Sequence, residues 1–186
     1  MVWILKETND LRYGLHKYIL DKIIQKKPSK NFRPQTFYKI GVATAALLWP
    51  HASKKELKAK KRHTLRHIAV INMKKSPGTA KADIDTIVEL LKKDADFLKR
   101  QLELLKPRVI VVGGMKSSRR IKKELIDMLR LEKVEGKKDL YYSPMLNAHL
   151  ISTHHPAYTK LTYKKLIDEF RGFAESICGA DLAGAK

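Results

Sequence analysis

The stretch Lys106-Pro107-Arg108-Val109-Ile110-Val111-Val112-Gly113-Gly114 places four consecutive branched apolar residues between a long helical pattern and a pair of glycines. A short run that is apolar on both faces is typical of a strand in a covered parallel sheet. Three other runs have the same character: Val2–Leu5, Ile68–Asn72 and His149–Ser152. The chain is therefore expected to form a sheet of four strands.

Helical patterns occupy the segments between and after these strands. They cover Leu11–Gln25, Pro34–Trp49, Asp83–Lys106, Ser117–Leu131 and Tyr163–Ile177. The clearest repeats apolar residues at helical spacing over Asp83–Lys106 and is followed by Pro107. Strands that alternate with helices indicate an α/β protein. We predict a three-layer α/β/α sandwich with a central, mainly parallel four-stranded sheet, formed by residues 1–186 as a single domain.

The charge of the chain is strongly unbalanced. Its 39 Lys and Arg residues face 19 Asp and Glu residues, which gives a formal net charge of +20. Such a charge attracts polyanions, of which nucleic acid is the commonest and an anionic membrane surface the second. Charge does not distinguish DNA from RNA.

Membrane insertion and cysteine-based cofactors are not expected. No apolar run reaches the roughly 18 residues that a spanning helix needs, and the apolar start of the chain is too short for a signal peptide. The single cysteine, Cys178, excludes an internal disulfide, a Cys-rich zinc site and a four-Cys iron–sulfur site. We expect a cytoplasmic protein without cofactor or metal. A monomer is favoured, although the sequence does not set the oligomeric state.

Polar residues follow the predicted strands, where the ligand crevice of a parallel sheet lies. Glu7 follows the first strand and can activate water, or it is a solvated residue near a helix capped by Asn9 or Asp10. Asn72 ends the second strand, and its amide can read the edge of a pyrimidine or satisfy a local turn. His155 follows the last strand, where Pro156 favours an extended backbone. It can donate a hydrogen bond to a developing oxyanion, with a metal ligand or a plain surface loop as the alternatives.

Basic residues are densest between Lys54 and His63, a run that includes Lys58, Lys60, Lys61 and Arg62. Lys74 and Lys75 form a second basic turn after Asn72. These residues are candidates for contact with phosphates, and the alternative for the first run is a solvated helical face or a short flexible segment.

The order of these segments resembles the uracil-DNA glycosylase superfamily. In that superfamily a first strand ends in a motif such as GQDPY, GINPG or GEAPG, and here Leu5-Lys6-Glu7-Thr8-Asn9 occupies that place. An Asn ends the second strand, in one branch as N-x-x-K, and here Asn72-Met73-Lys74-Lys75 matches it. A third strand like KPKVIVALG corresponds to Lys106–Gly114, and a final HPS corresponds to His155-Pro156-Ala157. The first motif lacks its Gly and Pro here, and Ala157 replaces the Ser.

The resemblance implies hydrolysis of the N-glycosidic bond of uracil or another deaminated base, after the base has left the stack. Glu7 would position water and oppose the positive sugar, Asn72 would read the base with Asn9 nearby, and His155 would stabilise the departing base. A ring should stack on the base, and three residues qualify: Tyr13, Phe37 and Tyr38. Tyr158 or Leu161 would fill the gap in the duplex.

Two other functions stay open from the sequence. The first is a non-catalytic nucleic-acid-binding protein that retains the glycosylase fold. The second is a basic interaction module of a larger complex.

Overall fold

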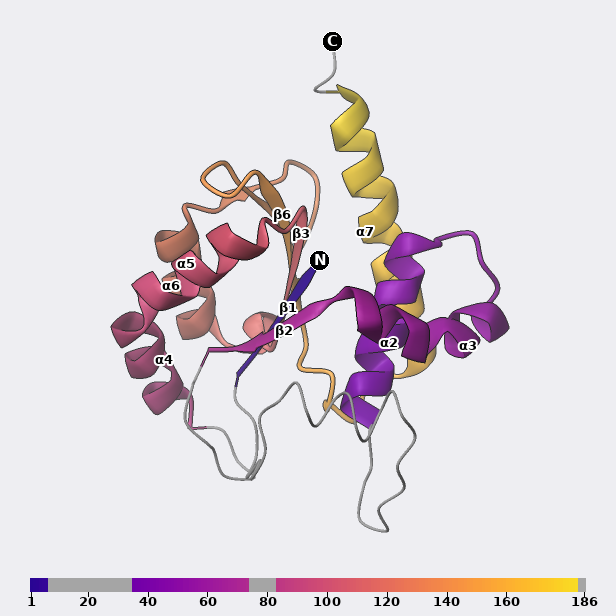
Figure 1. Ribbon diagram of the computed structural model, residues 1–186, viewed down its shortest axis with the longest axis horizontal. Helices are drawn as coiled ribbons and strands as arrows, with labels where there is room; N and C mark the ends of the chain where they lie inside the picture. The colour runs from indigo at the N-terminus through magenta and orange to yellow at the C-terminus, as the bar shows by residue number, and fades with distance from the viewer. Residues whose placement is uncertain (7–34, 74–82, 184–186) are drawn as a thin grey trace. The chain divides into compact units, whose positions relative to one another are not determined.

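The computed structural model describes residues 1–6, 35–73 and 83–183 (Figure 1). The chain divides into two compact units, each built from two segments of the sequence. The first unit consists of Met1–Arg12 and Ile68–His155, and the second of Tyr13–His67 and Pro156–Lys186. The single domain stays a prediction.

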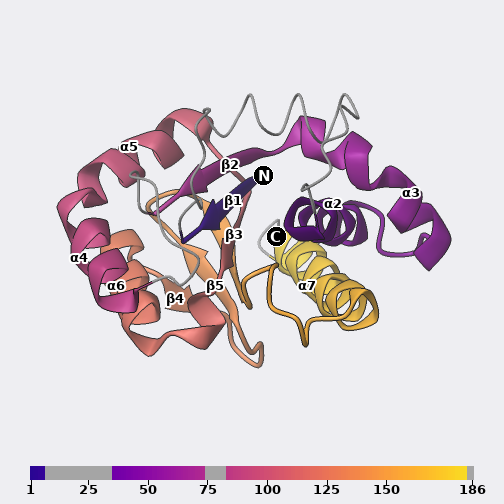
Figure 2. The ribbon, with the colours of Figure 1, turned by 90° about the horizontal axis from the view of Figure 1, so that it is seen from below.

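The first unit contains a six-stranded mixed sheet in the order β2-β1-β3-β6-β5-β4 (Figure 2). Its strands are β1 (Val2–Leu5), β2 (Ala69–Asn72), β3 (Val109–Gly113), β4 (Glu132–Lys133), β5 (Leu140–Ser143) and β6 (Ala148–Thr153). Strands β2, β1, β3 and β6 are parallel, and they are the four strands expected from the sequence. The α/β class is confirmed.

The prediction of a four-stranded sheet is wrong, because β5 and β4 extend it beyond β6 by antiparallel pairing. Asn147, at φ 48, lies in the tight connection between β5 and β6. Strand β4 has only two residues, Glu132 and Lys133, and both are exposed. So short and polar a strand carries no apolar signal.

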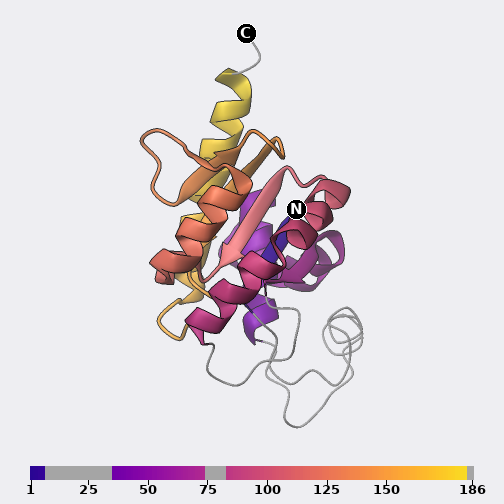
Figure 3. The ribbon, with the colours of Figure 1, turned by 90° about the vertical axis from the view of Figure 1, so that its left-hand side faces the viewer.

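Three helices of the first unit cover one face of the sheet: α4 (Ile84–Lys93), α5 (Ala95–Leu105) and α6 (Arg119–Leu129) (Figure 2, Figure 3). Alternate strand residues, among them Ile4, Ile110 and Val112, pack with apolar residues of these helices in one buried core. This is the arrangement that the periodic apolar patterns predict. The third layer of the sandwich stays a prediction.

The prediction of one continuous helix over Asp83–Lys106 is wrong, because this segment forms two helices. Asp94 ends α4, donating its backbone N–H to the Leu90 carbonyl, and it also precedes the first residue of α5. Asp favours helix ends over helix interiors, since its side chain competes for backbone hydrogen bonds. Helix α5 ends at Lys106, in the left-handed conformation at φ 42, just before Pro107.

The second unit contains α2 (Gln35–Leu48), α3 (Lys54–Thr64), the 3-10 turn η2 (Leu65–His67) and α7 (Tyr163–Ala183). Helix α2 packs against both α3 and α7. The basic run is therefore helical, and Ser53 begins it with a capping box in which Ser53 and Glu56 each bind the other's backbone N–H. No helix within the described ranges is both long and apolar enough to cross a membrane.

Helices α2 and α3 approach each other closely at Gly41. A Cβ added at Gly41 would lie 2.0 Å from the carbonyl oxygen of Lys61. The hydroxyl of Thr64 donates to the carbonyl oxygen of Gly41 at 2.8 Å. The absence of a side chain at Gly41 therefore sets the distance between the two helices.

Candidate functional site

The carboxyl ends of β2, β1, β3 and β6 form one edge of the sheet. The register pairs Leu5 with Asn72 and Gly113 with Thr153. Asn72 therefore lies at the same edge as the loop that carries His154 and His155. Because the four strands are parallel, this is the edge where polar strand ends are expected to converge.

Asn72 is half-buried at the end of β2. Its Oδ1 atom is buried and has no hydrogen-bond partner among the described residues. The next residue continues the pairing with β1, because the Met73 N–H donates to the Leu5 carbonyl at 2.8 Å. A buried acceptor left without a donor costs about 1–3 kcal/mol, so Oδ1 of Asn72 is an acceptor whose hydrogen bond the described residues do not provide.

His155 is held neutral at this edge. Burial, and after it the positive charge of Lys6, lowers the pKa of His155 from 6.5 to about 4. At neutral pH the ring therefore has one N–H donor and one acceptor nitrogen. A neutral donor beside a fixed cation is suited to an oxygen that gains negative charge.

Gly114 makes room for the Lys6 side chain. Its backbone has φ 96, a conformation that favours glycine, and an added Cβ would lie 2.5 Å from Cε of Lys6. The Gly114 N–H donates to the carbonyl oxygen of Thr153 at 2.8 Å. The pair Gly113-Gly114 is a weak signal in the sequence. In the structure, Gly114 brings together the ends of β1, β3 and β6 at this edge.

Ser117 and His154 form a contact that sequence reasoning missed. Ser117, in the 3-10 turn η3 (Met115–Ser117), has its Oγ 2.9 Å from Nδ1 of His154. The next helix is capped by Ser118, whose side chain accepts from the Ile121 N–H. Ser117 instead ties the loop after β3 to the residue before His155.

The second unit contains the described residues that are predicted to stack on the base or to fill the duplex: Phe37, Tyr38, Tyr158 and Leu161. Phe37 is buried in α2, and the hydroxyl of Tyr38 accepts a hydrogen bond from Arg62 at 2.8 Å. Tyr158 is exposed, and its carbonyl oxygen accepts from Nζ of Lys39 at 3.0 Å, whereas Leu161 is buried. Of the two residues expected to fill a duplex, Tyr158 is the accessible one.

The predicted phosphate-binding residues of α3 all lie near aromatic rings. Nζ of Lys60 is 4.7 Å from the ring centre of Trp49, and Nζ of Lys58 is 5.6 Å from that of Tyr163. Lys61 and Arg62 both lie over the ring of Tyr38. The sequence interpretation considered Tyr38 only as a ring that stacks on the base and did not include Trp49 or Tyr163, because residues 38, 49 and 163 are far apart in the chain.

Five predicted site residues lie outside the described residues: Glu7, Asn9, Tyr13, Lys74 and Lys75. Within the described ranges, no group of three or more His, Cys, Asp or Glu side chains is placed to hold a metal ion. Scans against protein-family models and curated proteins found no match to the chain.

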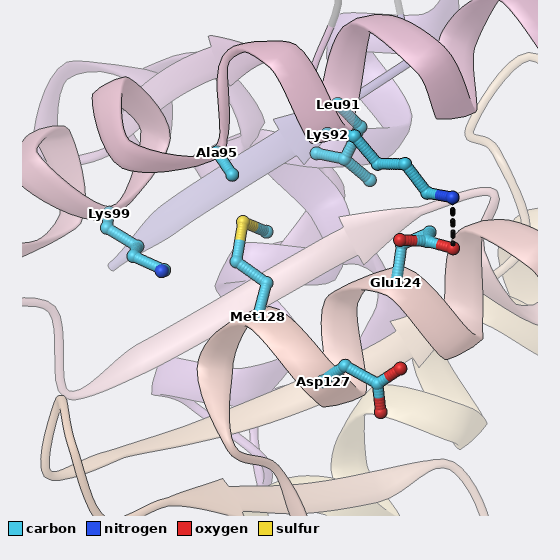
Figure 4. Close-up of a pocket in the computed structure, with 7 residues that line it drawn as sticks. All are labelled: Leu91, Lys92, Ala95, Lys99, Glu124, Asp127 and Met128. Carbon is cyan, nitrogen blue, oxygen red and sulfur yellow. Dashed lines mark ion pairs between the residues drawn. The ribbon is translucent and has the colours of Figure 1, made fainter.

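A cavity of about 300 Å³ lies between α4, α5 and α6 (Figure 4). Leu91, Ala95 and Met128 contribute its apolar part, and Lys92 pairs with Glu124 at 3.4 Å on its wall. None of its lining residues comes from a strand end, so this cavity is separate from the candidate site.

The lowered pKa of His155 makes stability depend on pH. Below pH 6.5 the unfolded chain binds a proton at this residue, whereas the folded chain binds it only near pH 4. The contribution of the neutral His155 ring to the free energy of unfolding is therefore complete above pH 6.5. This contribution is lost as the pH falls toward 4, and about 1 kcal/mol of it is lost at pH 5.5. Urea denaturation of wild type and His155→Asn at pH 7 and pH 5.5 should show this difference. Parallel pH dependence in the two proteins would contradict a buried, neutral His155.

Proposed function

We propose that the protein is a monofunctional DNA glycosylase that hydrolyses the N-glycosidic bond of uracil or another deaminated base. The observation that supports this most is the buried, unpartnered Oδ1 of Asn72 at the sheet edge that also carries His155. An amide acceptor and donor at the same sheet edge as a neutral imidazole are the kinds of group that match the polar edge of a pyrimidine base. The resemblance of the sequence motifs to the uracil-DNA glycosylase superfamily points to the same chemistry.

In the proposed reaction, water adds to C1′ of the sugar while the bond from C1′ to the base nitrogen breaks. The bonding electron pair leaves with the base, and the sugar passes through an oxocarbenium-like state. Glu7, the residue after Lys6 in the sequence, would accept the proton of the water and oppose the positive charge of the sugar. The proton is then available to the departed base.

The environment of His155 suits the leaving base. A departing uracil carries its negative charge on its carbonyl oxygens, and a ring N–H of neutral His155 would donate to one of them. The positive charge of Lys6, which helps to keep His155 neutral, would stabilise the same anion. Both groups act without gaining or losing a proton before the bond breaks.

The direct test is base release by the purified full chain from single- and double-stranded oligonucleotides that contain uracil, hypoxanthine or xanthine. We expect release of at least one of these bases, in the presence of EDTA, because the roles proposed for Glu7, Asn72 and His155 require no metal. If no base is released from any strand while DNA binding persists, the protein is a binding-only relative. The basic helix α3 would then carry its function.

Asn72→Asp should change which base is accepted. The substitution keeps an acceptor but removes the amide donor to the uracil O4 atom. We expect uracil release to fall by about tenfold or more, since a site that has lost one hydrogen bond to its substrate discriminates against it. Single-turnover rates on uracil- and cytosine-containing strands would measure the shift. An unchanged preference between the two bases would contradict a role for Asn72 in reading the base.

A further inference from the structure

Helix α3 has a high positive charge that ion pairs among the described residues do not neutralise. It contains six Lys or Arg residues and one acid, Glu56. Glu56 is engaged at the start of the helix, where its carboxylate accepts the Ser53 N–H at 2.7 Å. No ion pair between described residues includes a cation of α3. The helix therefore presents its charge to whatever binds it.

Three aromatic rings from other parts of the second unit lie against these cations. Tyr38 comes from α2, Trp49 follows the end of α2, and Tyr163 begins α7. Burial raises the pKa of Tyr163, and the nearby Tyr38 raises it further. We call the set formed by these rings and Lys58, Lys60, Lys61 and Arg62 the aromatic–basic surface.

The residues of this surface are accessible. Lys58 is exposed, and the other three cations and all three rings are half-buried. Lys58 and Arg62, one helical turn apart, lie on one flank of α3, where they meet the two tyrosines. Lys60 meets Trp49.

We propose that the aromatic–basic surface binds single-stranded nucleic acid, with the cations on phosphates and the rings stacked on unpaired bases. This inference deepens the proposed function and rests on it for the identity of the partner as nucleic acid. In the free protein each ammonium group occupies the face of a ring. On binding, the ammonium moves to a phosphate and a base takes its place.

The relative strengths of the contacts favour this exchange. An exposed cation–π contact strengthens an equilibrium by only about two- to fivefold. A base stacked on an aromatic ring contributes about five- to a hundredfold, and the released lysine gains a phosphate contact. In a duplex the base faces are already stacked, so duplex DNA offers this surface its phosphates alone. The surface should therefore prefer single strands.

The test is the binding of a uracil-free single strand and of its duplex to the full chain, by fluorescence anisotropy over a range of salt. We expect the single strand to bind more tightly at equal salt. Trp49→Leu should weaken single-strand binding by about tenfold and leave its salt slope unchanged. Lys60→Gln should weaken both ligands and lower the single-strand slope by about 0.7.

Tryptophan emission gives a second readout of the same contact. The chain has two tryptophans, and Trp3 is fully buried, so quenching by a single strand reports on Trp49. Phe97→Leu, which removes a 55% exposed ring from α5 in the other unit, is the matched control and should change neither readout. Circular dichroism of each variant verifies the fold.

Two results would overturn the proposal and leave a simple phosphate-binding helix. One is an equal affinity for the single strand and the duplex, and the other is an equal loss of affinity for both ligands with Trp49→Leu. Because the strands contain no uracil, this result is independent of base release. An active glycosylase without strand preference would refute only the inference. A single-strand binder that releases no base would refute only the proposed function.

Discussion

Replacing His155 by Ala is expected to lower the single-turnover rate of uracil release about a hundredfold, the usual scale for one preorganised hydrogen-bond donor. The neutral ring of His155, beside the positive Lys6, is placed to donate to the leaving base. Without the ring, only water and Lys6 would stabilise the anion of the departing base. Glu7→Gln should have a similar effect for a different reason, because it removes the negative charge that opposes the oxocarbenium ion.

Both variants should retain the DNA affinity of wild type, since phosphate contacts provide most of it. The matched control is His51→Ala, because His51 is an exposed histidine of the second unit and its loss should leave the rate unchanged. Rates measured with enzyme in excess separate the chemical step from product release. If wild type is active and both His155→Ala and Glu7→Gln are equally active, the base is released at another site.

Gly41→Ala should destabilise the protein by about 3 kcal/mol, as overpacking at a tight contact typically does. The added methyl group would lie 2.0 Å from the Lys61 carbonyl oxygen, which is part of the α3 backbone and cannot rotate away. Helices α2 and α3 must then separate, and the hydrogen bond from Thr64 to Gly41 is strained with them.

Gly172→Ala provides the matched control in the same unit. No atom lies within 4 Å of a Cβ added at Gly172, which is exposed in α7. Alanine is the better helix former there and should stabilise the protein by about 0.5–1 kcal/mol. Urea denaturation followed by circular dichroism would measure both changes. A loss at Gly41 no larger than a few tenths of a kcal/mol would show that α2 and α3 are not in contact as described.

The parallel strands were predictable because each is a short, mostly apolar run between segments of helical period, although the residues of β2 are only half-buried. Strands β4 and β5 were not, because a two-residue exposed strand has no period and Leu140–Ser143 lies close to the turn that leads into β6. The break at Asp94 was missed for a related reason: the apolar stripes of α4 and α5 continue past it.

The site was predictable in part. Asn72 and the His155 loop could be assigned to one edge because parallel strands have a common direction. The neutral state of His155 depends on burial and on Lys6, and neither is readable from the neighbouring sequence. The aromatic–basic surface depends on packing between α2, α3 and α7, which brings distant rings to α3.

The position of β1 has a consequence for the order of folding. This strand lies between β2 and β3, so a strand that is synthesised before both neighbours pairs on both sides with strands that begin at Ala69 and Val109. Its side chains Val2, Trp3, Ile4 and Leu5, all buried in the finished protein, must wait for most of the chain to be synthesised. Pairings of such long sequence separation close slowly. Strand β1 is therefore a segment that stays exposed to chaperones, or to aggregation, until β2 and β3 have been synthesised.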